Sequence, residues 1–174
     1  MMYNDILYIL LLVLPLIVFM AAIFDIYSYQ IPNILSVILI AGFYVFAIAN
    51  PNMTWGDIGI HTLLGMLALI VCFSLFCFGL FGGGDAKILA ASSLWFGSQN
   101  ILEYVFLVTI WGGILAVLVF LFRGQPCYPI ILRFKSLSSL YFGNGNKRAM
   151  PYAVAIAAGL YVTLPTSEIL KTVL

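Results

Sequence analysis

Long apolar runs, broken by short polar stretches, fill this chain and decide what it folds into. Of its 174 residues, 64% are hydrophobic and only 7% are charged, whereas an ordinary soluble protein carries about 25% charged residues. A soluble domain of this size has too little interior to cover so much apolar surface. The sequence therefore predicts an all-α polytopic membrane protein, with one domain over residues 1–174.

Hydropathy predicts six transmembrane helices, because a span needs about 20 predominantly apolar residues. The six segments are 6–24, 33–49, 58–81, 86–98, 101–122 and 150–165. The fourth is short, and such a length also fits a re-entrant segment. We expect a short crossing helix instead, beside thinned bilayer or a water-filled cavity.

Basic residues predict the orientation, because cytoplasmic loops of membrane proteins are enriched in Lys and Arg. With six spans, the loops 25–32, 82–87 and 123–148 share one side. Six of the seven basic residues lie there, and only Lys171 lies opposite. That side is therefore expected to be cytoplasmic, with both termini outside. Within 123–148, apolar residues recur near helical spacing with basic residues between them, which predicts a helix in the cytoplasmic interface near anionic lipid.

Asp25 and Asp85 are the only carboxylates on the predicted cytoplasmic side. Two spans separate them, so the chain returns to the same face. An ionisable residue at a membrane boundary is costly and is a candidate for function. Taken singly, Asp85 also fits a helix N-cap, and Asp25 fits the polar end of a span. Taken together, they predict a pair that activates water.

The chain lacks the residue patterns that zinc and serine hydrolases need. One histidine, His61, cannot supply a His-Glu-x-x-His zinc site. The three cysteines form no CxxC pair and are odd in number, which argues against a disulfide framework and a zinc site. No serine lies in a Gly-x-Ser-Gly context, and no basic patch with interleaved aromatics points to nucleic acid. The sequence thus predicts a two-aspartate hydrolase without metal or cofactor.

A carboxyl pair has a sound mechanism for peptide hydrolysis. Two carboxyls that share a site cannot both ionise easily, so one proton is held between them. The ionised member takes a proton from water, and the protonated member supports the oxyanion and later protonates the amine. Asp25 lies near the end of a helix, where the dipole disfavours charge, and Asp85 lies at the start of one. We therefore expect Asp25 to carry the shared proton more often.

The residues that flank the pair are further candidates for loop support and substrate contact. These are Gly82, Gly83, Gly84, Lys87, Ile31, Pro32 and Asn33. A glycine run before an acid fits close backbone approach or mobility for substrate entry, and it also fits a plain turn. The Ile-Pro-Asn segment also fits a helix start. Lys87 either anchors to lipid phosphate or biases the charge of the pair.

These motifs resemble those of a known family. Asp25 followed by Ile-Pro-Asn, then Gly-Gly-Gly-Asp85-Ala-Lys, then the closing segment 147–159, is similar to the type IV prepilin peptidases, which are aspartyl membrane proteases of the GxGD type. The resemblance implies that Asp25 and Asp85 are the catalytic aspartates. It further implies cleavage of a short cytoplasmic leader from a pilin-like (Flp-type) precursor in the bacterial inner membrane, usually after a glycine and just before the hydrophobic helix of the pilin.

Two departures from the family pattern matter. Larger members carry an N-terminal domain with paired CxxC zinc motifs, linked to N-methylation, whereas only five residues precede the first span here. We therefore expect no N-methyltransferase activity, and the compact size resembles the peptidases of tight-adherence pilus systems. The family often has Arg or Lys before Ile-Pro-Asn, where this chain has Tyr27, Ser28, Tyr29 and Gln30. A basic contact to lipid or substrate at that place is therefore in doubt.

Several other functions stay open. Archaeal preflagellin peptidases are relatives of the resembled family. A small transporter would use the two aspartates as ion or proton ligands, and it predicts more polar residues at mid-span than spans one, two and five show. A structural membrane subunit of a secretion machine would use the glycine loop for assembly. For the peptidase, the expected partners are a pilin-like precursor and membrane lipids.

Overall fold

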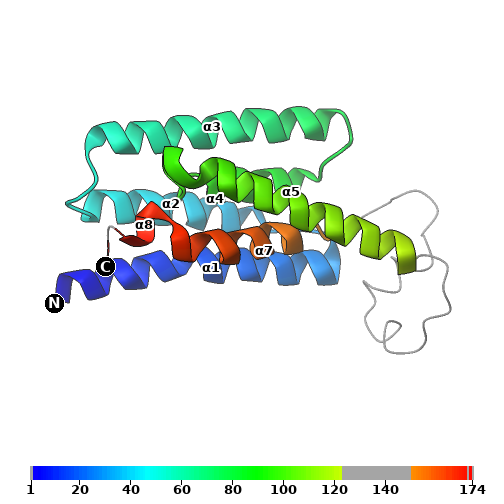
Figure 1. The fold of residues 1–174 in the computed structure, drawn as a ribbon, viewed down its shortest axis with the longest axis horizontal. Coiled ribbons are helices and arrows are strands. Elements are labelled where there is room, and N and C mark those ends of the chain that lie inside the picture. The colour runs from blue at the N-terminus through cyan, green and yellow to red at the C-terminus, as the bar shows by residue number, and fades with distance from the viewer. Residues whose placement is uncertain (1, 123–149, 172, 174) are drawn as a thin grey trace.

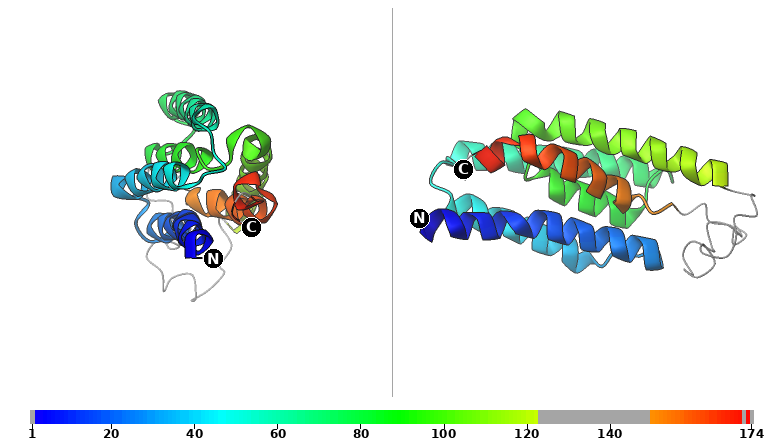
Figure 2. Two further views of the ribbon diagram at one scale, coloured as in Figure 1. Left: turned by 90° about the vertical axis from the view of Figure 1, so that its left-hand side faces the viewer. Right: turned by 60° about the horizontal axis from the view of Figure 1, so that its bottom comes forward.

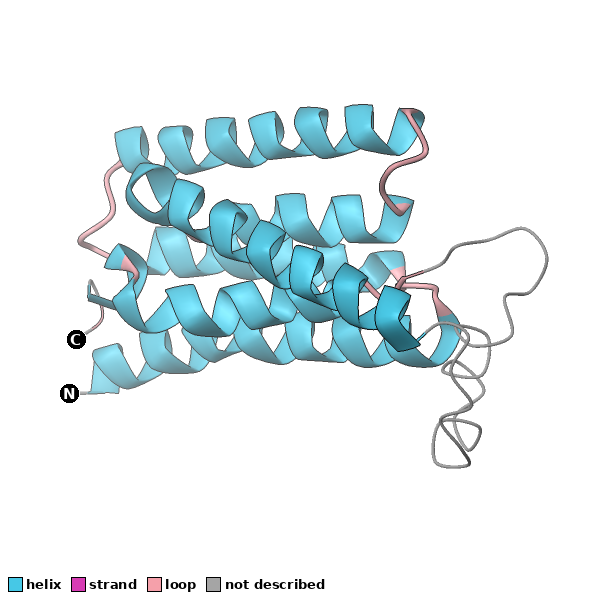
Figure 3. Ribbon diagram, turned by 45° about the vertical axis from the view of Figure 1, so that its right-hand side comes forward, coloured by secondary structure: helices cyan, strands magenta, loops and turns pink. Residues whose placement is uncertain are grey.

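The computed structural model describes residues 2–122, 150–171 and 173, and in this part of the chain every regular element is helical (Figure 1). Figure 3 shows the helices running side by side, with the connecting loops at the two ends. The helices are α1 (Met2–Ser28), α2 (Asn33–Ala49), α3 (Trp55–Cys77), α4 (Gly83–Ser93), α5 (Gly97–Phe122), α7 (Ala153–Thr163), the 3-10 turn η2 (Leu164–Thr166) and α8 (Glu168–Lys171). The all-α prediction is thus confirmed.

Three helices have the length and apolar composition needed to cross a membrane, namely Asp5–Ser28 within α1, α3, and Gly97–Val119 within α5. The apolar helices α2 and α7 are shorter. Each of the six predicted segments therefore corresponds to a helix, although only these three reach spanning length. The predicted interfacial helix in 123–148 lies outside the described residues.

The predicted end of the fourth segment is wrong. The helix α4 stops at Ser93 rather than at residue 98, and α5 already begins at Gly97. Residues 94–96 form a turn instead, in which Trp95 N–H donates to Ser92 O. Hydropathy read this turn as a continued span because it is apolar. Trp95 is in fact a core side chain, fully buried, whose indole N–H donates to Leu39 O at 3.1 Å.

Local sequence explains where α3 begins. Thr54 Oγ1 accepts a hydrogen bond from Asp57 N at 3.2 Å, and Asp57 Oδ2 accepts one from Thr54 N at 2.9 Å. This reciprocal capping box satisfies two backbone donors that the helix start leaves free. It begins the helix three residues before the predicted position 58. Asp57 therefore has a structural role at this end of the bundle.

The short helix α4 lies in the centre of the bundle and contacts α1, α2, α3, α5 and α7 (Figure 2). Eight of its eleven residues are buried. The long helices alternate in direction, so both chain termini lie at one end, opposite the loops 29–32 and 78–82 (Figure 1). Because the surrounding helices shield α4 from lipid, it does not need the length of an independent span.

Close packing of α7 on α5 depends on a glycine. A Cβ added at Gly159 would lie 2.9 Å from Val108 N and 3.1 Å from Val108 Cα. Small residues at such contacts let helices in a membrane approach closely. We expect Gly159→Ala to destabilise the protein by about 1–3 kcal/mol because the added methyl overpacks this contact. Thermal unfolding in detergent measures the loss.

Gly113→Ala is the matched control, because a Cβ at Gly113 on α5 would meet no atom within 4 Å. Alanine replaces glycine in a helix there without a clash, so stability should hold or rise slightly. Equal melting temperatures for the two variants would contradict the packing argument.

Candidate active site

The end of α1 positions Asp25. This aspartate lies in the last turn of the helix, and its side chain is only 4% exposed. The helix ends at Tyr29, which adopts a left-handed conformation (φ 52°) and donates from its N–H to Asp25 O at 3.0 Å. A residue in this conformation is a common way to end a helix. The chain then turns away towards α2, and the Asp25 carboxyl stays inside the bundle.

Asp85 enters the same region from the first turn of α4 and is 7% exposed. It is not the N-cap, because that position belongs to Gly82, which has extended backbone and accepts from Ala86 N at 3.0 Å. Asp85 Oδ1 is buried and has no hydrogen-bond partner among the described residues. A buried polar atom without a partner is unusual and calls for an explanation. Because Asp85 does not cap the helix, its Oδ1 can form a hydrogen bond with a bound molecule.

The two aspartates line one cavity of about 380 Å³, here called the aspartate cavity. It lies at the end of the bundle opposite the termini. The other lining residues are Tyr29, Gln30, Ile31, Asn33, Gly82, Gly83 and Gly84. Of the candidate site residues, only Pro32 and Lys87 do not line it. Pro32 is the N-cap of α2, in extended conformation, which agrees with the predicted helix start.

The glycine run lets the backbone at the start of α4 lie close to the Asp85 carboxyl and to Ile31. A Cβ added at Gly82 would collide with Asp85 Oδ2, and one at Gly84 would lie 3.1 Å from Ile31 Cβ. Side chains at these positions would push the Asp85 carboxyl and the chain before α2 out of place. Of the interpretations that the sequence left open, the structure favours close approach over a plain turn.

Sequence reasoning missed one donor to the pair. Ala153 N–H, at the start of α7, donates to Asp25 Oδ2 at 2.9 Å. First-turn N–H groups have no partner within their own helix, and they favour a negative charge nearby. Pro151 marked a helix start in the sequence, but nothing there showed which side chain this helix end would face.

This hydrogen bond reverses the expected position of the shared proton. An N–H donor stabilises the ionised form of Asp25. Asp85 Oδ1 has no donor within the described chain; the Ala153 N–H also favours the ionised form of Asp85, but burial and the charge of Asp25 outweigh it. The dipole of α1, on which the expectation rested, is weaker than a direct hydrogen bond. The geometry therefore favours a proton on Asp85.

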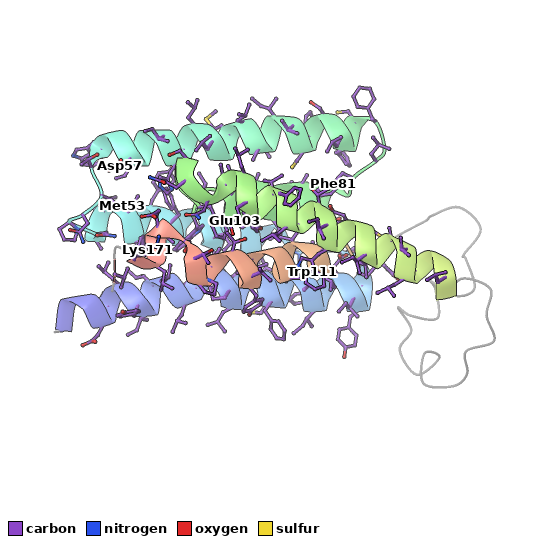
Figure 4. All side chains as sticks on the ribbon, in the orientation of Figure 1. Met53, Asp57, Phe81, Glu103, Trp111 and Lys171 are labelled. Atoms are coloured by element: carbon purple, nitrogen blue, oxygen red, sulfur yellow. The ribbon has the colours of Figure 1, made fainter. Side chains whose placement is uncertain are left out.

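Tyr152 connects the glycine loop to α7. Its ring packs edge-on against Phe81 at a centroid distance of 4.7 Å. Figure 4 shows Phe81 near the end of the bundle that carries the loop 78–82, with Asp57 towards the opposite end. The Tyr152 ring thus packs the start of α7 against the loop that precedes α4.

Lys87 and Asn33 form a polar link beside the aspartate cavity. Lys87 Nζ donates to Asn33 Oδ1 at 2.9 Å, which connects the second turn of α4 to the start of α2. The Lys87 side chain is exposed. Its role towards lipid phosphate or towards the pair stays a prediction.

The remaining titratable groups of the described chain lie elsewhere or have structural partners. His61 Nδ1 lies 2.6 Å from Leu94 O, and its ring stacks on Phe43. Asp57 and Glu168 line a different cavity, of about 230 Å³, together with residues 96–99. No cluster of three metal-ligating side chains is found over the described ranges. The aspartate pair is thus the strongest candidate for chemistry.

A comparison with known protein families matches residues 12–117 to the type IV leader peptidase family. The chain belongs to this family. The matched range covers more than half of the sequence and contains both Asp25 and Asp85. This leader peptidase match confirms the family resemblance seen in the motifs, and it identifies the membrane-helical protein as a peptidase. Neither a curated protein nor a solved structure matches the chain significantly.

The position of the shared proton can be tested by infrared spectroscopy. A protonated carboxyl has a C=O stretch that an ionised one lacks. At neutral pH we expect this band in the wild-type protein and in Asp25→Asn, because a lone buried Asp85 stays protonated. Asp85→Asn should lose the band, because the amide of Ala153 keeps Asp25 ionised. A band that vanishes only in Asp25→Asn would contradict this assignment.

The glycine run offers a second test. Gly82→Ala should lower peptidase activity at least about tenfold, because the added methyl displaces the Asp85 carboxylate. Gly83→Ala is the matched control, since its Cβ would meet only the movable ring of Phe76, at 3.2 Å. Circular dichroism checks that both variants keep their helices. Equal activities for Gly82→Ala and wild type would refute the close-approach argument.

Proposed function

We propose that the protein is an aspartyl endopeptidase that removes the short cytoplasmic leader from type IV pilin-like (Flp-type) precursors. The observation that carries the proposal is the pair of buried aspartates on one cavity, of which Asp85 keeps an unpartnered oxygen. Membership in the type IV leader peptidase family supports it.

The proposed reaction starts with Asp25 ionised and Asp85 protonated. Asp25 takes a proton from a water molecule, and the resulting hydroxide adds to the carbonyl carbon of the scissile peptide bond. The O–H of Asp85 stabilises the oxyanion that forms. As the carbon–nitrogen bond breaks, Asp85 gives its proton to the leaving amine, and the oxyanion returns to a carbonyl. A proton transfer from Asp25 to Asp85 then restores the starting state.

In this proposal the two oxygens of Asp25 have different tasks. Oδ2 accepts the hydrogen bond from Ala153 N–H, which fixes the carboxylate in place. The other oxygen is left to act as the base towards water. Pre-organised groups of this kind lower the barrier because little rearrangement is needed during the reaction.

We further propose that the six apolar helices α1, α2, α3, α4, α5 and α7 together form a bundle that crosses a bacterial inner membrane, with the aspartate cavity at the cytoplasmic face. The bias of basic residues towards the loops at that end supports this orientation. A precursor whose leader is cytoplasmic and whose next segment is an apolar helix would then present its scissile bond at the depth of the pair. This orientation would leave both termini outside.

The decisive experiment mixes the purified protein with a pilin-like precursor in detergent and identifies the product by mass spectrometry. We expect one cut that removes the leader. A panel that also contains an archaeal preflagellin separates the two substrate classes. Intact precursors throughout would refute the peptidase proposal and favour a transporter or a structural subunit.

Replacement of either aspartate should abolish this cleavage. Asp25→Asn and Asp85→Asn each remove one proton-transfer group, and such groups contribute at least about a hundredfold to the rate. Asp57→Asn and Glu103→Gln are matched controls on acids away from the aspartate cavity, and both should stay active. Full activity of either the Asp25→Asn or the Asp85→Asn variant would rule out the two-aspartate mechanism.

A further inference from the structure

A second cavity adjoins the aspartate cavity and is not used by the proposed chemistry. It has a volume of about 470 Å³, lies between α2, α3 and α4, and shares Asn33 with the aspartate cavity. We call it the lateral groove. Its lining is mostly apolar and includes Val37 and Ile40 of α2, Met66 and Leu69 of α3, and Ala90 and Ala91 of α4.

The lateral groove is open at its side. The helices α2 and α3 make almost no backbone contact with each other, and Figure 2 shows α3 at the edge of the bundle, next to α4. A hydrogen bond of 3.1 Å between Tyr44 Oη and Thr62 Oγ1 bridges the two helices at the far end of the groove. Val37, on its wall, remains 56% exposed. An apolar groove open towards lipid can admit an apolar segment from the membrane without moving it through water.

The length of the lateral groove and the small residues on its α4 side both suit a bound helix. Along α2 it extends from Asn33 to Tyr44, which at 1.5 Å per residue is about 17 Å, or three helical turns. On the α4 side the groove is lined by Ala90 and Ala91, and small residues of this kind let a second helix come close in a membrane.

We infer that the lateral groove binds the apolar helix that follows the scissile bond of the precursor. This inference rests on the proposed function and assigns the substrate a second binding site on α2, α3 and α4. Asn33 lines both cavities, so the groove adjoins the aspartate cavity. A helix seated there leads directly to a peptide bond beside Asp25 and Asp85.

The link between Lys87 and Asn33 sets the depth of the bound helix. Lys87 lines the groove at the end that meets the aspartate cavity, and one of its donors is held by Asn33. An ammonium group keeps its remaining donors in a polar setting. An apolar segment therefore stops at this position. The peptide continues from there as the polar, extended stretch that carries the scissile bond.

Photo-crosslinking tests the site directly. A photoreactive phenylalanine analogue replaces Val37 in the inactive Asp85→Asn protein, and the precursor is added. The matched control carries the analogue at Val45, on the same helix, equally apolar and 53% exposed but outside the groove. We expect capture of the precursor from position 37 and not from position 45. Equal capture from both positions, or capture of lipid alone from position 37, would overturn the inference.

Kinetics give an independent readout. Val37→Trp fills the groove and should raise KM for the precursor at least about tenfold, with kcat changed less than about twofold, because binding is lost and chemistry is not. Val45→Trp should leave both constants unchanged. If Val37→Trp and Val45→Trp cleave the precursor alike, the groove proposal fails while the peptidase proposal stands. A wild-type protein that cleaves no precursor refutes the proposed function itself.

Discussion

A carboxylate withdrawn from water needs a compensating donor, and this protein brings one from the far end of its chain. Asp25 is buried at the end of the first helix, and Ala153 N–H at the start of α7 donates to it across 128 residues of sequence. An unpaired buried charge costs several kcal/mol. The placement of α7 against α1 and α5 is therefore tied to the charge of the pair, and the close contact at Gly159 helps to hold it there.

The helix α4 meets a second constraint, which is to carry an acid into the centre of the bundle. It is buried on nearly all sides and packs against α1, α2, α3, α5 and α7. Its first turn uses glycine to bring Asp85 and Ile31 close, and its other end is fixed by the buried Trp95. The same short helix lines the lateral groove. One element thus shapes both cavities, and a shift of α4 would change both.

The sequence predicted the all-helical class and the meeting of the two aspartates. Asp25 and Asp85 line one cavity because two helical segments separate them, so the chain returns to the same end of the bundle. The glycine run brings the backbone close to the Asp85 carboxyl, where a side chain at Gly82 would not fit. The sequence could not predict the donor at Ala153, since every residue but proline has an N–H and its partner is set by packing. The boundary between α4 and α5 was missed for a related reason, because an apolar turn in the core resembles a span. The lateral groove likewise arises from the spacing of three helices, which leaves no pattern along the chain.

The hydrogen bond from α7 also has a consequence for the order in which the protein is made. Both carboxylates lie within residues 1–122, which are synthesised first. The amide that holds Asp25 is added about thirty residues later, with the short helix α7. A nascent chain that lacks α7 would hold Asp25 without the donor that fixes its carboxylate. The geometry of the pair would thus be complete only once α7 has been added.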